Sequence, residues 1–241
     1  MKILGKIGFI WFAIWFVLSF LLLYPFFIIT LYNPKWHETA NKLRKLWAWI
    51  LITVSFLRPK IKMNKGAFNQ ASVIVCNHTS YIDIVALGLV MPSKVSFMAK
   101  QELAKIPLFG IFFKTVDIGV NRSSIKDSHK AFTIAQEKLK SGISIVIFPE
   151  GTIWDKVPQL KPFKNGAFKL AIDAKVPIIP VTFYNNFRIL PDMKTEFYPH
   201  QMKFKVHRPE ITSHLKDEDS DALKNKIFTI IENELIENKI I

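Results

Sequence analysis

The hydrophobic pattern divides the chain into an apolar N-terminal part and an alternating remainder. Residues 7–32 carry no charged side chain and consist almost entirely of Ile, Leu, Phe, Trp, Val and Ala. About 20 such residues suffice to cross the hydrocarbon core of a bilayer. The run is too long for a cleaved signal peptide, and no small-residue cleavage pattern follows it. We therefore predict a membrane-associated helix, kinked near residues 21–24 by Pro25.

A second apolar segment follows directly. Residues 35–57 begin with basic side chains and end in an apolar run of 12 residues, 46–57, which is too short to cross a bilayer alone. Basic side chains flank both ends of the pair: Lys2, Lys6, Arg58, Lys60, Lys62 and Lys65. The positive-inside rule places both ends in the cytoplasm. We predict that residues 1–58 form a two-helix membrane motif that dips into one leaflet; a full span is the alternative.

Residues 59–241 have a different pattern, in which short β-rich runs alternate with segments of helical spacing. The expected strands are 72–76, 94–98, 115–118, 143–148, 177–184 and 202–206, and the expected helices are 81–90, 127–140, 165–174 and 219–236. Such alternation is typical of a sheet whose faces are covered by helices. The predicted fold class is therefore α/β, with a mixed, mainly parallel sheet flanked by helices behind the N-terminal motif.

Composition narrows the class of partner. The chain has 33 basic and 19 acidic residues, a formal net charge of +14. This charge favours a polyanionic partner, and charge alone does not separate nucleic acid from an anionic membrane surface. The single cysteine, Cys76, excludes an intrachain disulfide and a cysteine-rich metal site.

His78 is the first candidate for chemistry. A short apolar run, 73–76, leads into the segment that contains His78 and Asp83, and a run of helical character follows. On one ideal helix, positions five apart point about 140° away from each other, so the two side chains meet only if His78 lies in the turn before the helix. Ser80, a good N-cap residue, favours that arrangement. Two interpretations stay open: a histidine base oriented by an aspartate, or a capping-box-like Ser80 and Asp83 beside an ordinary loop histidine.

Further candidates stand at the ends of other predicted strands. The run 143–148 leads into Pro149, Glu150 and Gly151, and ligands of open α/β sheets gather at the carboxyl ends of strands. Gly151 permits a close backbone approach to a ligand. The basic candidates at such ends or nearby are Lys100, Arg122, Lys161, Lys164 and Lys169. Each is individually typical of a solvated surface; together they indicate a phosphate site.

Together these motifs resemble the glycerolipid acyltransferase family, most closely its 1-acylglycerol-3-phosphate acyltransferases. Four blocks of that family occur in order, within a resemblance that covers about residues 60 to 210. The blocks are NHTSYID at 77–83, DIGVNR at 117–122, FPEGT at 148–152 and VPIIPV at 176–181. Each block alone is a weak signal, whereas all four in this order are specific.

The resemblance implies transfer of an acyl chain from acyl carrier protein or coenzyme A to the sn-2 hydroxyl of a lysophospholipid, at the cytoplasmic face of the membrane. It implies His78 as general base and Asp83 as its orienting carboxylate. It also implies headgroup contacts by Lys100, Arg122, Glu150, Gly151, Thr152 and Lys164. No metal, no cofactor beyond the thioester co-substrate and no nucleic-acid partner is expected.

The chain departs from the family after Thr152. Ile153 and Trp154 stand where the family usually has Arg and often Ser, and Lys156, Lys161 or Lys164 could replace the lost cation. A lyso-ornithine or other lyso-aminolipid acceptor is therefore an alternative. A non-enzymatic anionic-lipid binder is a further one, but it leaves the histidine and aspartate without a role. A hydrolase has no support, because the chain lacks a Gly-x-Ser-x-Gly elbow.

Overall fold

A single sheet forms the centre of the molecule. The computed structural model describes residues 2–121, 123–191 and 194–241. Within them, seven strands follow the order β1-β7-β6-β2-β5-β3-β4. Their bounds are β1 (Arg58–Met63), β2 (Val73–Cys76), β3 (Val95–Lys100), β4 (Ile118–Val120), β5 (Ser144–Ile147), β6 (Ile178–Phe183) and β7 (Gln201–Val206). Every neighbouring pair is parallel except β6 and β7. The prediction of a mixed, mainly parallel sheet is confirmed.

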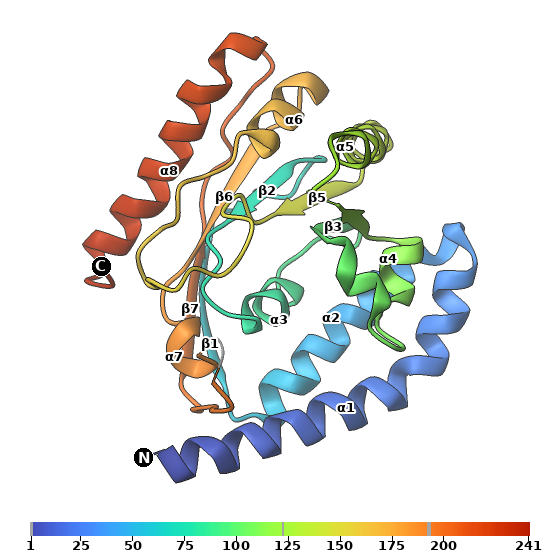
Figure 1. Ribbon diagram of the computed structural model, residues 1–241, viewed down its shortest axis with the longest axis vertical. Coiled ribbons are helices and arrows are strands. Elements are labelled where there is room, and N and C mark those ends of the chain that lie inside the picture. Colours follow the sequence, from blue (N-terminus) through green and yellow to red (C-terminus); the bar gives the residue numbers. More distant parts are fainter. Residues whose placement is uncertain (1, 122, 192–193) are drawn as a thin grey trace.

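Helices cover both faces of this sheet (Figure 1). On one face lie α5 (Ile125–Lys140), α6 (Gly166–Ala174) and α8 (Ser220–Glu237). On the other lie α1 (Lys2–Tyr32), α2 (His37–Val54) and α3 (Ile82–Gly88). The remaining short elements are η1 (Pro34–Trp36), η2 (Gln101–Lys105), α4 (Ile111–Thr115), α7 (Asn186–Ile189) and η3 (Asp217–Asp219).

The central strands explain the two-sided cover. All four residues of β2 are fully buried: Val73 and Val75 join the core under α5, α6 and α8, whereas Ile74 and Cys76 join the core under α1, α2 and α3. A strand buried on both faces appears in the sequence as a continuous apolar run, because neither face needs polar side chains. This is the pattern that identified β2 and β5.

The N-terminal motif consists of two packed helices. Among the described residues, α1 alone has the length and hydropathy to cross a membrane. It is one helix through Pro25, and Figure 1 shows it bending along its second half. One side packs on the rest of the chain through a cluster that includes Phe20, Phe27, Trp47 and Phe112. The other side exposes a row of apolar residues: Leu4, Ile7, Ile14, Leu18, Leu22, Phe26 and Ile29.

α2 is tied to the sheet by charge as well as by apolar contact. Arg44 donates two hydrogen bonds to Asp117, just before β4, at 3.1 and 2.5 Å. Ala48 and Ile52 of α2 also lie in the same buried cluster as Ile74 of β2. The division into residues 1–58 and 59–241 therefore stays a prediction, since the two parts share a core.

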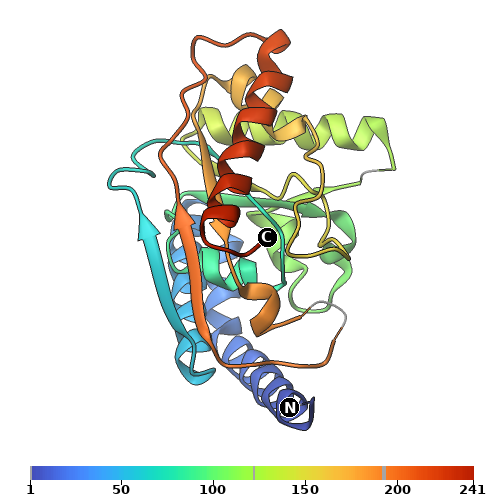
Figure 2. The same cartoon turned by 90° about the vertical axis from the view of Figure 1, so that its left-hand side faces the viewer.

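Two strands differ from expectation. The strand expected at 115–118 begins only at Ile118, because residues 111–115 form α4. The pattern did not predict β1, which pairs with β7 at the edge of the sheet (Figure 2). Its alternating Arg58, Lys60 and Lys62 are exposed. Basic side chains and a proline are typical of edge strands, where they discourage pairing with another chain, and they lower any β-propensity signal.

Candidate active site

The predicted site residues follow strands whose carboxyl ends lie at one edge. Strands β2 to β6 are mutually parallel, so their carboxyl ends all lie at the same end of the sheet. We call this end of the strands the carboxyl edge. His78 comes two residues after β2, Lys100 ends β3, and Glu150 comes three residues after β5. Arg122 follows β4 in the sequence but lies outside the described residues.

His78 and Asp83 meet in the turn between β2 and α3. His78 Nδ1 lies 3.1 Å from Asp83 Oδ2. Asp83 is fully buried, whereas 13% of the His78 side chain is exposed. A carboxylate only accepts hydrogen bonds, so Nδ1 carries the proton in this pairing and Nε2 is the basic nitrogen. The imidazole also stacks on Phe148, with ring centroids 4.1 Å apart. The ring is thus held on its face and at one nitrogen.

Four further hydrogen bonds hold the Asp83 carboxylate. Its Oδ2 accepts from the backbone N–H groups of Thr79, at 2.7 Å, and Ser80, at 2.9 Å. Its Oδ1 accepts from the Thr79 hydroxyl, at 3.2 Å, and from Asn186 Nδ2, at 2.8 Å. The Ser80 hydroxyl accepts from the N–H of Ile82, at 3.3 Å. Asp83 thus binds the backbone just before α3 and the imidazole at the same time, so the two arrangements are compatible, and the role of His78 as a base stays a prediction.

The turn is fastened to β6. Asn77 Nδ2 donates to the carbonyl of Phe183 at 3.0 Å, and the Phe183 N–H donates to Asn77 Oδ1 at 2.8 Å. The Ser80 hydroxyl donates to the carbonyl of Leu190 at 2.6 Å. These contacts join two segments more than 100 residues apart, so the position of His78 depends on the chain that follows β6.

Glu150 supports the backbone of His78. One carboxylate oxygen accepts the His78 N–H at 2.8 Å, and the other accepts the Lys161 N–H at 3.0 Å. Burial raises the pKa of Glu150 from 4.5 to about 7, against the opposing effect of these two N–H donors. Its two oxygens are engaged with backbone, so Glu150 shapes the loop that borders the imidazole.

The other described residues of the predicted site differ in exposure. Lys100 and Lys164 are exposed, whereas Gly151 and Thr152 are half-buried. Gly151 adopts φ of 81°, a left-handed conformation that glycine enters at little cost. The structure thus brings His78, Asp83 and Glu150 into contact and leaves the two lysines on the surface.

Asn186 is a residue that the sequence did not single out. It lies three residues beyond β6, more than 100 residues after Asp83, so no local spacing connects the two. The available signal was its place after a buried parallel strand, where site residues are expected. The same reasoning that selected Lys100 and Glu150 applies to Asn186.

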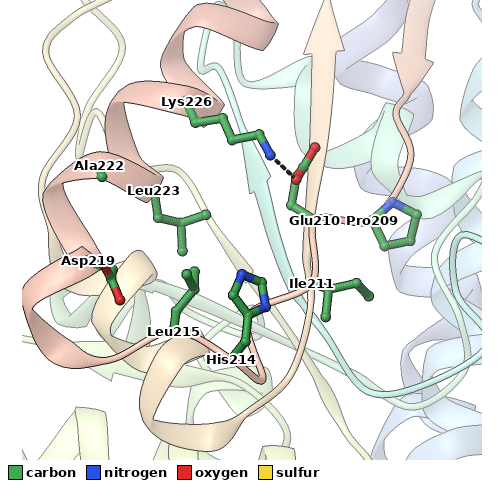
Figure 3. Close-up of a pocket in the computed structure, with 9 residues that line it drawn as sticks. All are labelled: Pro209, Glu210, Ile211, His214, Leu215, Asp219, Ala222, Leu223 and Lys226. Carbon is green, nitrogen blue, oxygen red and sulfur yellow. Dashed lines mark hydrogen bonds and ion pairs between the residues drawn. The ribbon is translucent and has the colours of Figure 1, made fainter.

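A separate pocket lies at the other end of the strands (Figure 3). Its volume is about 350 Å³, and it lies between the start of α8 and the segment 209–215. Glu210, which pairs with Lys226 at 2.6 Å, is bridged to Ile178, the first residue of β6. His78 instead follows the last residue of β2, which is parallel to β6. The pocket therefore holds none of the predicted site residues.

Comparison with known proteins agrees with the motifs. The family model described as "Acyltransferase" matches residues 37–184. The chain belongs to the acyltransferase family. The match to this acyltransferase model includes the predicted site residues from His78 to Lys164; Asn186, α1 and α8 lie outside it.

Individual acyltransferases resemble the chain over part of their length. An uncharacterized acyltransferase of Schizosaccharomyces pombe is 33% identical over 172 residues, which are 70% of this chain and 62% of that protein. A 1-acyl-sn-glycerol-3-phosphate acyltransferase of Helicobacter pylori is 34% identical over 135 residues, which are 55% of this chain and 57% of that protein. The chain thus spans about 60% of the length of these curated relatives.

A solved structure shares the whole fold. The crystal structure of the 1-acyl-sn-glycerophosphate acyltransferase PlsC from Thermotoga maritima superposes with a TM-score of 0.81 at 21% identity. The superposition covers 99% of this chain and 97% of that one. The common fold therefore includes the N-terminal helices as well as the sheet.

Proposed function

We propose that this acyltransferase moves a fatty acyl chain from acyl carrier protein or coenzyme A to the sn-2 hydroxyl of 1-acylglycerol-3-phosphate, giving phosphatidic acid. The observation that carries the proposal is the contact between His78 Nδ1 and Asp83 Oδ2 at the carboxyl edge. The Helicobacter pylori relative is a 1-acyl-sn-glycerol-3-phosphate acyltransferase, which supports the choice of acceptor.

In the proposed reaction, His78 is the general base. The acceptor hydroxyl oxygen attacks the thioester carbonyl carbon while Nε2 of His78 takes the hydroxyl proton, because an alcohol is a poor nucleophile until it loses that proton. Asp83 holds the Nδ1–H tautomer and stabilises the imidazolium that forms. The C–S bond then breaks, and the imidazolium returns its proton to the departing thiolate. The substrate supplies the nucleophile, so no acyl-enzyme forms.

Cations near the carboxyl edge would receive the acceptor phosphate. Lys100 and Lys164 are exposed at this edge and near it, and an ammonium group acts on phosphate as a point charge. Arg122 remains a proposed contact from the sequence. Gly151 and Thr152 offer backbone and hydroxyl groups in the loop shaped by Glu150. Lys100 or a backbone amide would also stabilise the oxyanion of the thioester carbonyl.

The N-terminal helices would bring the site to its lipid substrates. α1 packs on the rest of the chain from Gly5 to Leu31, and its opposite side is apolar and exposed. This supports a motif that lies in one leaflet, since a helix packed on the protein along one whole side is poorly placed to cross. We place the site on the cytoplasmic side, as the flanking basic residues indicate.

A panel of acceptors tests this proposal. Purified full-length protein is offered lysophosphatidic acid, lysophosphatidylethanolamine and lyso-ornithine lipid in vesicles. Each acceptor is tested with a labelled acyl chain carried either by acyl carrier protein or by coenzyme A. We expect the highest kcat/KM with lysophosphatidic acid. Preference for the lyso-aminolipid would overturn the acceptor and give a role to Ile153 and Trp154. Absence of transfer to every acceptor would overturn the enzymatic function.

A further inference from the structure

Two neighbouring asparagines follow β6, and they make different contacts. Asn185 binds the backbone of β7 twice: its Nδ2 donates to the carbonyl of Gln201 at 2.7 Å, and its Oδ1 accepts the Lys203 N–H at 2.9 Å. Both polar atoms of its amide are thereby satisfied. Asn185 therefore links the segment after β6 to β7.

Asn186 faces the opposite way, toward the site. It is fully buried, and its Nδ2 donates to Asp83 Oδ1 at 2.8 Å. Its own Oδ1 is buried and has no hydrogen-bond partner among the described residues. A buried amide oxygen without a partner costs stability. An asparagine at this position is therefore a poor choice for stability alone, and among the described residues its side chain makes one hydrogen bond, to the carboxylate beside His78.

The bond from Asn186 differs in origin from the other bonds to Asp83. Thr79 and Ser80, which donate three of them, belong to the same turn as His78 and Asp83. Asn186 comes from beyond β6, and the segment that carries it is fixed on both sides. Phe183 is bound to Asn77 before it, and the Leu190 carbonyl accepts from Ser80 after it. Asn186 thus ties the Asp83 carboxylate to the segment that follows β6.

We propose that Asn186 is a positioning residue for acyl transfer, which holds the Asp83 carboxylate so that Oδ2 faces Nδ1 of His78. The inference rests on the proposed function, because its role is to keep His78 in the tautomer and orientation that proton removal requires. Without the Asn186 donor, Oδ1 of Asp83 keeps, among the described residues, only the 3.2 Å hydrogen bond from the Thr79 hydroxyl, so the carboxylate and the imidazole that it orients are held less firmly. Small displacements of a catalytic group lower the rate strongly while leaving substrate binding intact.

The adjacent asparagines give a matched experiment in the full-length protein. Asn186→Ala should lower kcat about 10- to 100-fold with KM for both substrates changed less than about twofold, because positioning acts on the chemical step. Asn185→Ala removes two backbone contacts and should lower the Tm at least as much, while kcat stays within about threefold of wild type. A merely structural role would instead make the loss of kcat follow the loss of Tm in both variants.

A spectroscopic readout makes the test independent of turnover. The ring nitrogens of His78 are followed by ¹⁵N NMR, with His78→Ala used to assign the signals. We expect the Nδ1–H tautomer in wild type and in Asn185→Ala, and a mixture of tautomers in Asn186→Ala. Unchanged tautomer and unchanged kcat in Asn186→Ala would overturn the inference. A wild-type protein without acyl transfer would overturn the proposed function instead, and the NMR signal would still report on Asn186.

Discussion

Two histidines that follow strands, one partly buried and one buried, show how position and partner decide what an imidazole can do. His78 follows β2 at the carboxyl edge and faces the carboxylate of Asp83. His207 follows β7 in the antiparallel part of the sheet, and its Nε2 lies 2.9 Å from the Thr182 hydroxyl. One nitrogen of each ring faces one side-chain partner, but only the partner of His78 is an anion that can stabilise an imidazolium.

The surroundings of His207 suit a neutral ring. Burial lowers its pKa from 6.5 to about 4, the charge of Lys205 adds to that effect, and Glu234 opposes it. His207 is therefore uncharged near neutral pH and serves as a packed hydrogen-bonding group. The proposed chemistry at His78 therefore depends on the turn that brings Asp83 to its ring, since burial of a histidine alone supplies no anionic partner.

Apart from the removal of His78, the largest expected effect comes from Asp83. The partner of His78 is this carboxylate, whereas the partner of His207 is a hydroxyl. Asp83→Asn places an amide against two backbone N–H groups and the imidazole, so the tautomer is lost. We expect kcat to fall about 10²- to 10⁴-fold. Steady-state rates are compared with those of Glu234→Gln, which removes the buried charge beside Tyr184 and Lys205 in the other region. Equal losses of kcat in Asp83→Asn and Glu234→Gln would show that the carboxylate beside His78 has no special role in acyl transfer.

A smaller effect is expected from the lipid side of the molecule. Leu18 and Leu22 lie on the exposed side of α1. Each Leu side chain that moves from water into lipid contributes about 1.5–3 kcal/mol to the free energy of membrane binding. The double change Leu18→Ser and Leu22→Ser should weaken binding to anionic vesicles at least about tenfold. Sedimentation with vesicles measures this, and Ile125→Ser, at an equally apolar position of α5 that is 92% exposed, is the control. Unchanged vesicle binding in the double variant would show that α1 does not enter the lipid.

The smallest expected effect concerns stability against pH. The folded pKa of Glu150, about 7, lies above its ordinary 4.5, so its contribution is complete below about pH 4.5 and is lost as pH rises through 7. His207, with a folded pKa of about 4, has the opposite sign: its contribution is present above pH 6.5 and is lost as pH falls through 4. The two slopes oppose each other between pH 4.5 and 6.5.

Two variants separate these slopes. From pH 4.5 to 6.5, Glu150→Gln should make the free energy of unfolding rise more steeply with pH than in wild type, and His207→Gln should make it rise less steeply. Each change is about 1 kcal/mol per pH unit, measured by urea unfolding in detergent. Parallel curves for wild type and Glu150→Gln would show that the buried carboxyl does not titrate in this range.

The sequence predicted the parts of the molecule whose signals are local. β2 is a continuous apolar run, and β5 is one apart from Ser144, because both faces of these strands pack in the core. The His78 turn follows from the strand before it and Ser80 after it. β1 was missed because its basic side chains and Pro59 suit an edge strand and resemble a loop. Asn186 was missed because its contact with Asp83 depends on the order of strands in the sheet. A single sequence does not reveal that order.

The most direct test of the central claim compares the two histidines by acyl transfer itself. Labelled diacyl product is measured from a labelled acyl thioester and 1-acylglycerol-3-phosphate, with equal amounts of vesicle-bound wild type, His78→Ala and His207→Gln. We expect His207→Gln to stay close to wild type and His78→Ala to lose about 10²- to 10⁴-fold in rate while it remains folded and bound. Turnover by His78→Ala above a few per cent of wild type would contradict the central claim.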